Sequence, residues 1–395
     1  MNVPFLDLKR QYEQLKDELE AKVTEVMRSG AYIGGRYVDA FEEQMREYLN
    51  VKHVISCANG TDAIMLALRA CNVGIGDEVI TTPFTFFATA EAIAAIGAVP
   101  VFVDVKESDF NIDPSLVEAK ITAKTKAILP VHLFGFPCDM EALNNIAAKH
   151  SLHVVEDAAQ AIGSEYKGKK IGNTNNLVTF SFYPTKNLGA FGDAGMVTTN
   201  DDDLAVIARA FREHGMAKNG AKAREFLLGE KDEFAMESNT DALYNPYKYY
   251  NYLIAYNSRL DAMQAVILST KLKYLDDYNK SRTRIAKLYD AGLKGVVDIP
   301  VSPEDGASCY HQYVIRTKQK DELSASLAEK GIGTGAFYPV PLHLQKAFNY
   351  LGYKEGDMPV SEMLSKETVC LPIFPELTDD EAESVICEIR EFLGK

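Results

Sequence analysis

Between residues 50 and 200 the sequence alternates short apolar, β-branched runs with helical or loop segments. The first run, HVISCA, ends at Asn59-Gly60, and the following AIMLALRAC suits a helix that is capped by Thr61 or Asn59. Further runs of the same kind are EVITTP, VPVFVDV, KAILPVHLFG, LHVVED and NLVTFSFYP. This alternation predicts a mainly parallel sheet that is covered by helices on both faces.

The pattern changes after residue 257. Residues 259–296 are amphipathic and predict one long helix or two abutting helices. In the mixed segment that follows, YHQYVIRT is typical of a strand, and DELSASLAEKG and DDEAESVICEIREFL are typical of helices. We therefore expect a large α/β domain over residues 1–265 and a smaller C-terminal α+β domain over residues 266–395.

Residues 216–256 interrupt this organisation and are expected to form an inserted loop. The segment is polar and turn-rich, and its end is crowded with tyrosines: Tyr244, Tyr247, Tyr249, Tyr250, Tyr252 and Tyr256. Two interpretations stay open. The segment is either a surface excursion whose tyrosines pack on its own body or on a partner chain, or a lid over a bound substrate.

Charge and cysteine usage exclude several classes of protein. Asp and Glu number 56 against 42 Lys and Arg, a formal net charge of -14, which disfavours nucleic-acid binding. The N-terminal residues lack the apolar core of a signal peptide, and every long apolar run is interrupted, so we expect neither secretion nor a membrane span. The scattered cysteines form no CxxC pair and the histidines form no HExxH pattern, which predicts a cytoplasmic protein without a metal site.

Polar residues fall at the ends of the predicted strands, where open α/β sheets bind their ligands. In Asn59-Gly60-Thr61, the glycine lets the backbone approach a ligand closely, and the free N–H groups of the following helix attract phosphate. An ordinary turn with a helix cap is the alternative for these residues. No GxxxxGK[ST] loop is present, so a nucleoside-triphosphate site is not indicated.

A carboxylate follows the apolar strand LHVV in the segment EDAAQ. Asp157 at this strand end is costly to bury unless a cation meets it. Capping of a following helix is the alternative role for this aspartate.

A lysine, Lys186, lies in SFYPTKNLG, between the strand LVTF and the glycine-rich GAFGDAG. Its apolar and small neighbours suit an amine nucleophile with a lowered pKa, and a solvated surface charge is the alternative. A further polar segment, YNSRLD, leads into the amphipathic residues 259–296. There the alternative is a helix cap with Arg259 and Asp261 on the exposed face.

Taken together, these residue types match the requirements of pyridoxal 5'-phosphate. A lysine amine condenses with the cofactor aldehyde, and a carboxylate keeps the ring nitrogen protonated so that the ring accepts electrons. Glycine N–H groups and a serine hydroxyl receive the phosphate. The sequence therefore predicts a pyridoxal-phosphate enzyme.

The segments EDAAQ, SFYPTKNLGAFGDAG and YNSRLDAMQA, in this order, closely resemble the DegT/StrS-type sugar aminotransferases. The segments FLDL, SCANGTDA, TTPFTFFATAEA, PVHLFG, HQYVIR and YPVPLH also match, so the resemblance covers nearly the whole chain. It implies the type I aminotransferase fold of pyridoxal-phosphate enzymes. It also implies a homodimer in which the two subunits share their active sites.

The resemblance assigns roles to individual residues. Lys186 is expected to be the Schiff-base lysine and proton shuttle, and Asp157 the partner of the pyridine nitrogen. Gln160 is expected beside the ring near its phenolic oxygen, and Phe86 against the ring face. The phosphate and the substrate are expected to contact Gly60, Thr61 and Ser181, Asn257 from the second subunit, and Arg259 and Tyr338.

The implied reaction has two halves. L-glutamate gives its amino group to the cofactor, and the cofactor then aminates the carbonyl carbon of a sugar. In each half Lys186 moves a proton between the substrate carbon and C4′ of the cofactor. Some relatives carry histidine in place of this lysine and catalyse dehydration, so the presence of Lys186 favours transamination.

Two departures from the family bear on the sugar. Phe337 stands where many relatives have histidine, and in residues 216–256 acidic side chains outnumber the basic ones. Both features fit a sugar without a nucleotide, and we expect the C8 aldehyde of an oxidised 3-deoxy-octulosonate used in lipopolysaccharide synthesis. One alternative is a nucleotide-linked 3-keto or 4-keto hexose of O-antigen or deoxyaminosugar pathways. The other is a non-catalytic sensor on the same fold.

Overall fold

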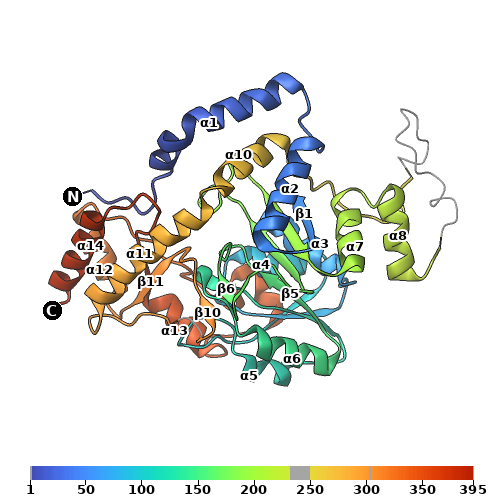
Figure 1. The fold of residues 1–395 in the computed structure, drawn as a ribbon. Helices are drawn as coiled ribbons and strands as arrows, with labels where there is room; N and C mark the ends of the chain where they lie inside the picture. The colour runs from blue at the N-terminus through green and yellow to red at the C-terminus, as the bar shows by residue number, and fades with distance from the viewer. Residues whose placement is uncertain (1, 232–249, 302–303, 395) are drawn as a thin grey trace.

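A seven-stranded sheet forms the centre of the computed structural model, which describes residues 2–231, 250–301 and 304–394 (Figure 1). In spatial order the strands are β1 (His53–Cys57), β9 (Gly195–Thr199), β8 (Leu177–Ser181), β5 (His153–Asp157), β4 (Thr125–Leu129), β2 (Glu78–Thr81) and β3 (Val99–Phe102). β9 runs antiparallel to both β1 and β8, whereas the other neighbouring strands pair in parallel. The prediction of a mainly parallel sheet is confirmed.

The sequence analysis did not identify β9. This strand begins at Gly195, the last residue of the glycine-rich GAFGDAG, which is typical of a loop. All of its residues are nevertheless buried, because the strand lies inside the sheet between β1 and β8. Residues 182–194 therefore connect two strands that are hydrogen-bonded to each other.

Helices cover both faces of this sheet, as the alternating sequence predicts. These helices are α2 (Arg36–Leu49), α3 (Gly60–Ala70), α4 (Phe87–Ala95), α5 (Pro114–Val117), α6 (Met140–His150), α7 (Asp202–Arg212) and α10 (Ala262–Leu272). In β1, Ile55 and Cys57 pack in one core with α3, α4 and α7, and Val54 packs in the other core with α2 and α10. Alternate residues of a strand point to opposite faces, so each strand contributes to both cores.

The amphipathic residues 259–296 form two abutting helices, α10 and α11 (Leu275–Leu293). Beyond them β11 (Tyr313–Arg316) pairs antiparallel with β12 (Thr368–Leu371). The helices of this part are α12 (Lys320–Glu329), α13 (Pro359–Glu367) and α14 (Asp379–Phe392). α12 and α14 pack with α11 around a separate core that contains Tyr289, Tyr313 and Val385, whereas α13 packs through Leu364 into another core. The strand and the two helices expected here are therefore present.

Shorter elements join the two parts. A three-stranded sheet consists of β10 (Gly306–Ala307), β6 (Glu165–Tyr166) and β7 (Lys169–Lys170). The 3-10 helices are η1 (Glu118–Lys120), η2 (Leu133–Gly135), η4 (Leu342–Leu344) and η5 (Lys346–Leu351). β6 and β7 precede β8 in the chain, whereas β10 lies between α11 and β11, so this small sheet links the larger parts of the molecule.

The N-terminal helix α1 (Leu8–Ser29) bridges the same two parts (Figure 1). Val3 pairs with Ile332 beside α12, and both ends of the chain lie on this side of the molecule. Leu19 then packs against Ile267 of α10 and Tyr278 of α11. The first residues of the chain thus contact the part that the sequence assigns to the small domain. The boundary at residue 265 stays a prediction.

The segment 216–256, expected as a loop, contains the helix α8 (Ala217–Leu228). Asn219-Gly220 is typical of a turn, but Gly220 is needed for packing, since a Cβ there would lie 2.0 Å from the Gly215 carbonyl oxygen. Tyr252 is buried against Ala221 of this helix. Tyr244, Tyr247, Lys248 and Tyr249 lie outside the described residues, and the choice between a surface excursion and a lid stays a prediction.

Candidate active site

The carboxyl ends of β1, β5 and β8 bring several predicted site residues to one edge of the sheet. α3 begins at Gly60, directly after β1, and approaches Ser181 at the end of β8. A Cβ on Gly60 would lie 2.7 Å from the Ser181 Cβ, so only glycine fits without a shift. The serine hydroxyl and the N–H groups of the α3 N-terminus therefore lie side by side, an arrangement that suits phosphate.

Of the two expected caps of α3, Asn59 is the one that forms. Its Oδ1 accepts a hydrogen bond of 2.8 Å from the backbone N–H of Asp62. Thr61 lies inside the first turn of the helix and is only partly buried. Because capping does not use its side chain, the Thr61 hydroxyl is free to serve a ligand at this helix terminus.

Asp157 ends β5 and is only 5% exposed. Thr89 Oγ1 donates to its Oδ2 at 2.8 Å, and the backbone N–H of Ala159 donates to its Oδ1 at 3.1 Å. Burial raises the pKa of this carboxyl, against the lowering effect of both hydrogen bonds and of the Lys186 charge. The alternative role as a helix cap is wrong, since no helix begins among the turns that follow β5.

Lys186 lies on the connection between β8 and β9, where its backbone N–H donates to the Tyr183 carbonyl oxygen at 2.8 Å. Desolvation lowers the pKa of its ammonium to about 8, although the nearby Asp157 and Cys309 act in the opposite direction. About a tenth of this lysine is thus uncharged at pH 7 and about half at pH 8. The alternative of a fully solvated surface charge is not what the structure shows.

Gln160 connects this edge of the sheet to the C-terminal part. Its Oε1 accepts from the backbone N–H of Phe134 at 2.6 Å, and its Nε2 donates to Tyr338 Oη at 2.9 Å. The Tyr338 ring lies 6.1 Å from the ring of Phe86. Phe86 is 58% exposed, at the residue before α4. An exposed aromatic ring at the start of α4, the helix whose Thr89 contacts Asp157, suits stacking with a flat ligand.

Asn257 and Arg259 lie apart from these residues. Asn257 is exposed and pairs through its backbone with Glu213, which also forms an ion pair of 3.5 Å with Arg259. Between them, Ser258 Oγ donates to Asp62 in the first turn of α3 at 2.7 Å. Asp261 occupies the cap position of α10 but makes no capping hydrogen bond. Among the described contacts, none joins the Asn257 or Arg259 side chain to the other predicted site residues.

Sequence reasoning missed several residues that surround Lys186 and Asp157. Thr89 contacts Asp157 from the first turn of α4, and Asn187 follows the lysine directly. Asn187 Oδ1 is 3.1 Å from His311 Nδ1, and Cys309 is close enough to Lys186 to affect its pKa. His311 lies in HQYVIR, which was recognised only as a family segment. In the described ranges no cluster of three or more His, Cys, Asp or Glu side chains is placed to hold a metal ion.

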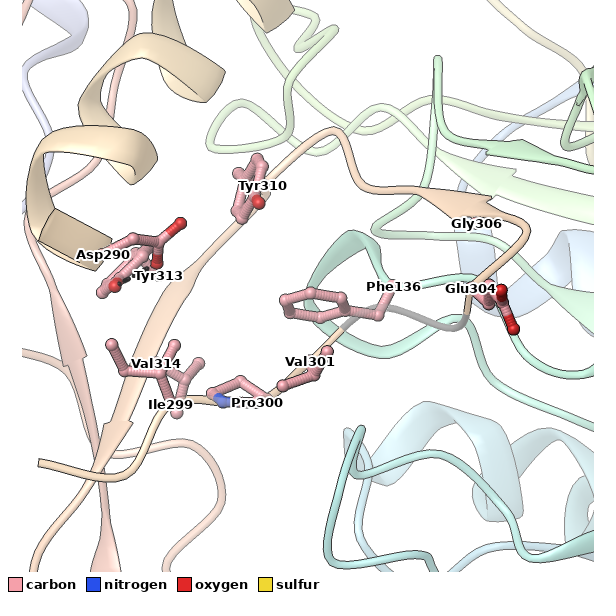
Figure 2. A pocket seen from close by; sticks show the side chains of 10 residues that line it. All are labelled: Phe136, Asp290, Ile299, Pro300, Val301, Glu304, Gly306, Tyr310, Tyr313 and Val314. Carbon is pink, nitrogen blue, oxygen red and sulfur yellow. Dashed lines mark hydrogen bonds between the residues drawn. The ribbon is translucent and has the colours of Figure 1, made fainter. Parts of the chain in front are cut away.

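A pocket of about 500 Å³ lies elsewhere, beside β10 and β11 (Figure 2). The lining residues are Phe136, Asp290, Ile299, Pro300, Val301, Glu304, Gly306, Tyr310, Tyr313 and Val314. Its polar groups are largely engaged, since Tyr313 Oη donates to Asp290 at 2.7 Å. None of the predicted site residues lines this pocket, so it is separate from the edge of the sheet described above.

Comparison with known proteins agrees with this geometry. A sequence model of the DegT/DnrJ/EryC1/StrS aminotransferase family matches residues 13–390. The chain is 49% identical to the pleiotropic regulatory protein of Geobacillus stearothermophilus over 99% of both chains. It is 40% identical to dTDP-3-amino-3,4,6-trideoxy-alpha-D-glucose transaminase of Streptomyces venezuelae, over 99% of this chain and 96% of the relative.

The fold is shared with a solved structure. The crystal structure of S. venezuelae DesV in complex with a ketimine intermediate superposes with a TM-score of 0.90 at 39% sequence identity. The match covers 100% of this chain and 99% of DesV. The expected aminotransferase fold is therefore confirmed. In the described part of this chain, no helix has the length and apolar character needed to cross a membrane.

Proposed function

The chain belongs to the DegT/DnrJ/EryC1/StrS aminotransferase family and is a pyridoxal-phosphate-dependent aminotransferase, and from this premise we propose that it transfers the amino group of L-glutamate to a nucleotide-linked keto sugar. The observation that carries the proposal is the position of Lys186 beside Asp157 at the carboxyl edge of the sheet. A buried carboxylate and an amine with a lowered pKa are the two groups that this chemistry needs most.

The residues at the sheet edge fit the cofactor. Asp157 is buried and held by two hydrogen bonds, so its carboxylate suits the protonated ring nitrogen. The missing Cβ of Gly60 lets the N-terminus of α3 approach Ser181 closely, so its N–H groups and the serine hydroxyl can receive one phosphate together. We assign the ring face to Phe86, the phenolic-oxygen side to Gln160 and a phosphate contact to Thr61. When bound, the cofactor supplies an electron-accepting ring that makes the substrate Cα–H bond easier to break.

Lys186 is proposed to form the bond with the cofactor aldehyde and to move the proton in each half-reaction. Its pKa of about 8 means that the neutral amine, which accepts a proton from carbon, is well populated near pH 7 to 8. The same amine, once protonated, returns the proton to the neighbouring carbon. A lysine with the usual pKa would be almost entirely charged at that pH and a poor base.

The comparisons favour a nucleotide-linked sugar. The S. venezuelae relative is named as a transaminase that forms a dTDP-linked amino sugar. Phe337, whose presence suggested a sugar without a nucleotide, packs between Phe5 and Tyr338 at ring distances of 6.0 and 5.6 Å. We therefore propose a nucleotide-linked 3-keto or 4-keto hexose as the substrate. The octulosonate C8 aldehyde is not named among these relatives. A role in lipopolysaccharide synthesis stays a proposal, which relatives named as UDP-sugar aminotransferases support.

We propose a homodimer with shared active sites, and the exposed Asn257 and partly exposed Arg259 support it. Among the described contacts, neither side chain touches the other site residues of its own chain, and Asn257 has no side-chain hydrogen bond. We propose that they contribute to the site of a second copy, with Asn257 contacting the phosphate and Arg259 contacting the substrate. Tyr338, anchored through Gln160, is proposed to contact the substrate within its own chain.

One relative supports a second candidate function. The Geobacillus stearothermophilus protein, 49% identical, carries a regulatory name. A sensor that holds the cofactor without turning over a sugar is therefore the alternative to the enzyme.

Two measurements test the proposal. Borohydride reduction of the holoenzyme followed by peptide mass mapping is expected to find the cofactor on Lys186, and a tag on another side chain would refute the assignment. Release of 2-oxoglutarate from glutamate is then followed with nucleotide-linked 3-keto hexoses, 4-keto hexoses and the oxidised octulosonate. Turnover with a keto hexose identifies the enzyme, turnover only with the octulosonate contradicts the proposed substrate, and turnover with no sugar favours the sensor.

A further inference from the structure

The side chain of Asn187 joins three segments that are far apart in the sequence. Its Nδ2 donates to Asn279 Oδ1 of α11 at 2.9 Å and to the carbonyl oxygen of Cys309 at 3.0 Å. Its Oδ1 lies 3.1 Å from Nδ1 of His311. Asn187 is buried and directly follows Lys186. Its amide therefore ties residues 182–194, the segment that carries the lysine, to the C-terminal part of the chain.

The hydrogen bonds fix which atom donates in each pair. Asn279 Nδ2 donates to the Ile162 carbonyl oxygen at 3.2 Å, so the Oδ1 of Asn279 faces Asn187 as an acceptor. Asn187 must therefore present its Nδ2 to Asn279 and its Oδ1 to the histidine. His311 Nδ1 consequently carries the hydrogen and donates it to Asn187. Its other ring nitrogen makes no hydrogen bond among the described residues.

The surroundings of His311 keep it uncharged. The side chain is 6% exposed, and Arg282 Nη1 donates to the backbone carbonyl oxygens of Tyr310, His311 and Ile373. Burial, together with the positive charges of Lys186 and Arg282, holds the pKa of His311 well below its usual range. A neutral, rigidly held imidazole adds no charge beside the lysine.

We propose that His311 is a positioning residue for Lys186, acting through its hydrogen bond to Asn187 to hold the lysine segment in its water-poor position. The inference rests on the proposed role of Lys186. The backbone of this segment is also held by hydrogen bonds within residues 182–194, from Lys186 to Tyr183 and from Ala190 to Phe182. The Asn187 side chain fixes it against the C-terminal part of the chain, together with Lys271, whose Nζ donates to the Gly189 carbonyl oxygen at 2.8 Å.

Loss of the His311 hydrogen bond has a measurable consequence for the lysine. Desolvation is the largest cause of the lowered Lys186 pKa, so a segment that moves and admits water raises this pKa toward the usual lysine value. The effect does not require the cofactor. It is therefore separable from every measurement of turnover.

The test follows chemical labelling of Lys186 in the cofactor-free protein. Short pulses of acetic anhydride are applied at pH values from 6 to 11, and acetylation of Lys186 is measured by peptide mass spectrometry. The extent of acetylation at each pH is normalised to that of free lysine. The wild-type midpoint is expected near 8, as the Lys186 environment indicates. In His311→Ala the midpoint is expected to rise by about 1 unit. His311→Asn places an amide N–H donor near the position of Nδ1, so its midpoint is expected to lie close to the wild-type value.

Matched variants separate positioning from general destabilisation. Asn187→Ala removes the His311 contact together with the hydrogen bonds to Asn279 and Cys309, so it is expected to shift the midpoint at least as far as His311→Ala does. The double variant is expected to shift no further than Asn187→Ala, because the His311 contact is already lost. His343, equally buried and paired with Glu362 at 3.0 Å, provides the control. His343→Ala lowers the melting temperature but is expected to leave the Lys186 midpoint unchanged.

The outcomes are decisive for the inference. A wild-type midpoint in His311→Ala, or equal shifts in His311→Ala and His343→Ala, would overturn it. If His311→Ala does not fold, the comparison between His311→Asn and Asn187→Ala serves instead, with a shift expected only in Asn187→Ala. Borohydride trapping of another residue would refute the role of Lys186 itself, while the labelling result would still report whether His311 positions it.

Discussion

The two ends of the proposed active site differ in whether the residues of a single chain already lie together there. At the cofactor end, formed by Gly60, Asp157, Ser181 and Lys186, each residue lies at a strand end or on the connection that follows it, and close to another of the set. At the outer end, formed by Asn257 and Arg259, Asn257 is exposed, and among the described residues Arg259 pairs with Glu213 alone. The difference fits the proposal that folding of one chain organises the cofactor end, whereas a second copy and a substrate complete the outer end.

The largest effect is expected at Lys186. Lys186→Ala removes both the covalent anchor and the proton carrier, so turnover is expected to fall by about 10³-fold or more. The control is Lys273→Ala, an exposed lysine at the C-terminal end of α10 that pairs with Glu18 of α1. Steady-state 2-oxoglutarate release measures the effect. Near-normal turnover in Lys186→Ala would show that the cofactor end is assigned wrongly.

Replacement of Asp157 tests the other half of the cofactor end. Asp157→Asn keeps the shape but removes the negative charge that faces the ring nitrogen, and kcat is expected to fall by about 10²-fold. Asp104→Asn alters a similarly buried carboxylate, which accepts from the backbone N–H groups of Val360 and Ser361. That control is expected to lower the melting temperature while kcat stays close to the wild-type value. A fall confined to Asp104→Asn would contradict the assigned role of Asp157.

Gly60 tests the contact between α3 and β8. In Gly60→Ala the new Cβ would lie 2.7 Å from Ser181 Cβ, so the two elements must separate. Such overpacking costs about 1–3 kcal/mol, and we expect cofactor affinity to fall by about tenfold through the displaced phosphate contacts. Equilibrium dialysis against pyridoxal phosphate measures this loss. The control is Gly76→Ala, where no atom lies within 4 Å of the added Cβ. Unchanged cofactor affinity in Gly60→Ala would show that the N-terminus of α3 does not contact the phosphate.

The smallest effect concerns the outer end. When equal amounts of inactive Lys186→Ala and inactive Arg259→Ala subunits are unfolded together and refolded, half of the dimers carry one variant of each kind. In a shared-site dimer each mixed pair keeps one intact site, so activity is expected to return to about a quarter of the wild-type level. Activity assays and size-exclusion chromatography check this. If the mixture stays inactive although mixed dimers form, both residues serve the site of their own chain.

The comparison also explains what the sequence could predict. Asp157, Ser181 and Gly60 were found because parallel strands end at one edge, so polar residues after apolar runs converge there. β9 was missed because its first residue belongs to a glycine-rich stretch, and α8 because Asn219-Gly220 resembles a turn. The tie between Asn187 and His311 joins residues 124 positions apart, and no local periodicity reports such a contact.

The antiparallel strand β9 has a consequence for motion at the site. Residues 182–194 form a hairpin whose two stems, β8 and β9, are both members of the central ladder, and Phe182 N–H donates to the Ala194 carbonyl oxygen at its base. The paired strands fix the base of this connection, so it cannot swing as a whole without breaking the sheet, whereas its tip is held by contacts such as that of Asn187. In the proposed mechanism the Lys186 amine therefore moves mainly by rotation about its own side-chain bonds, over a few ångströms.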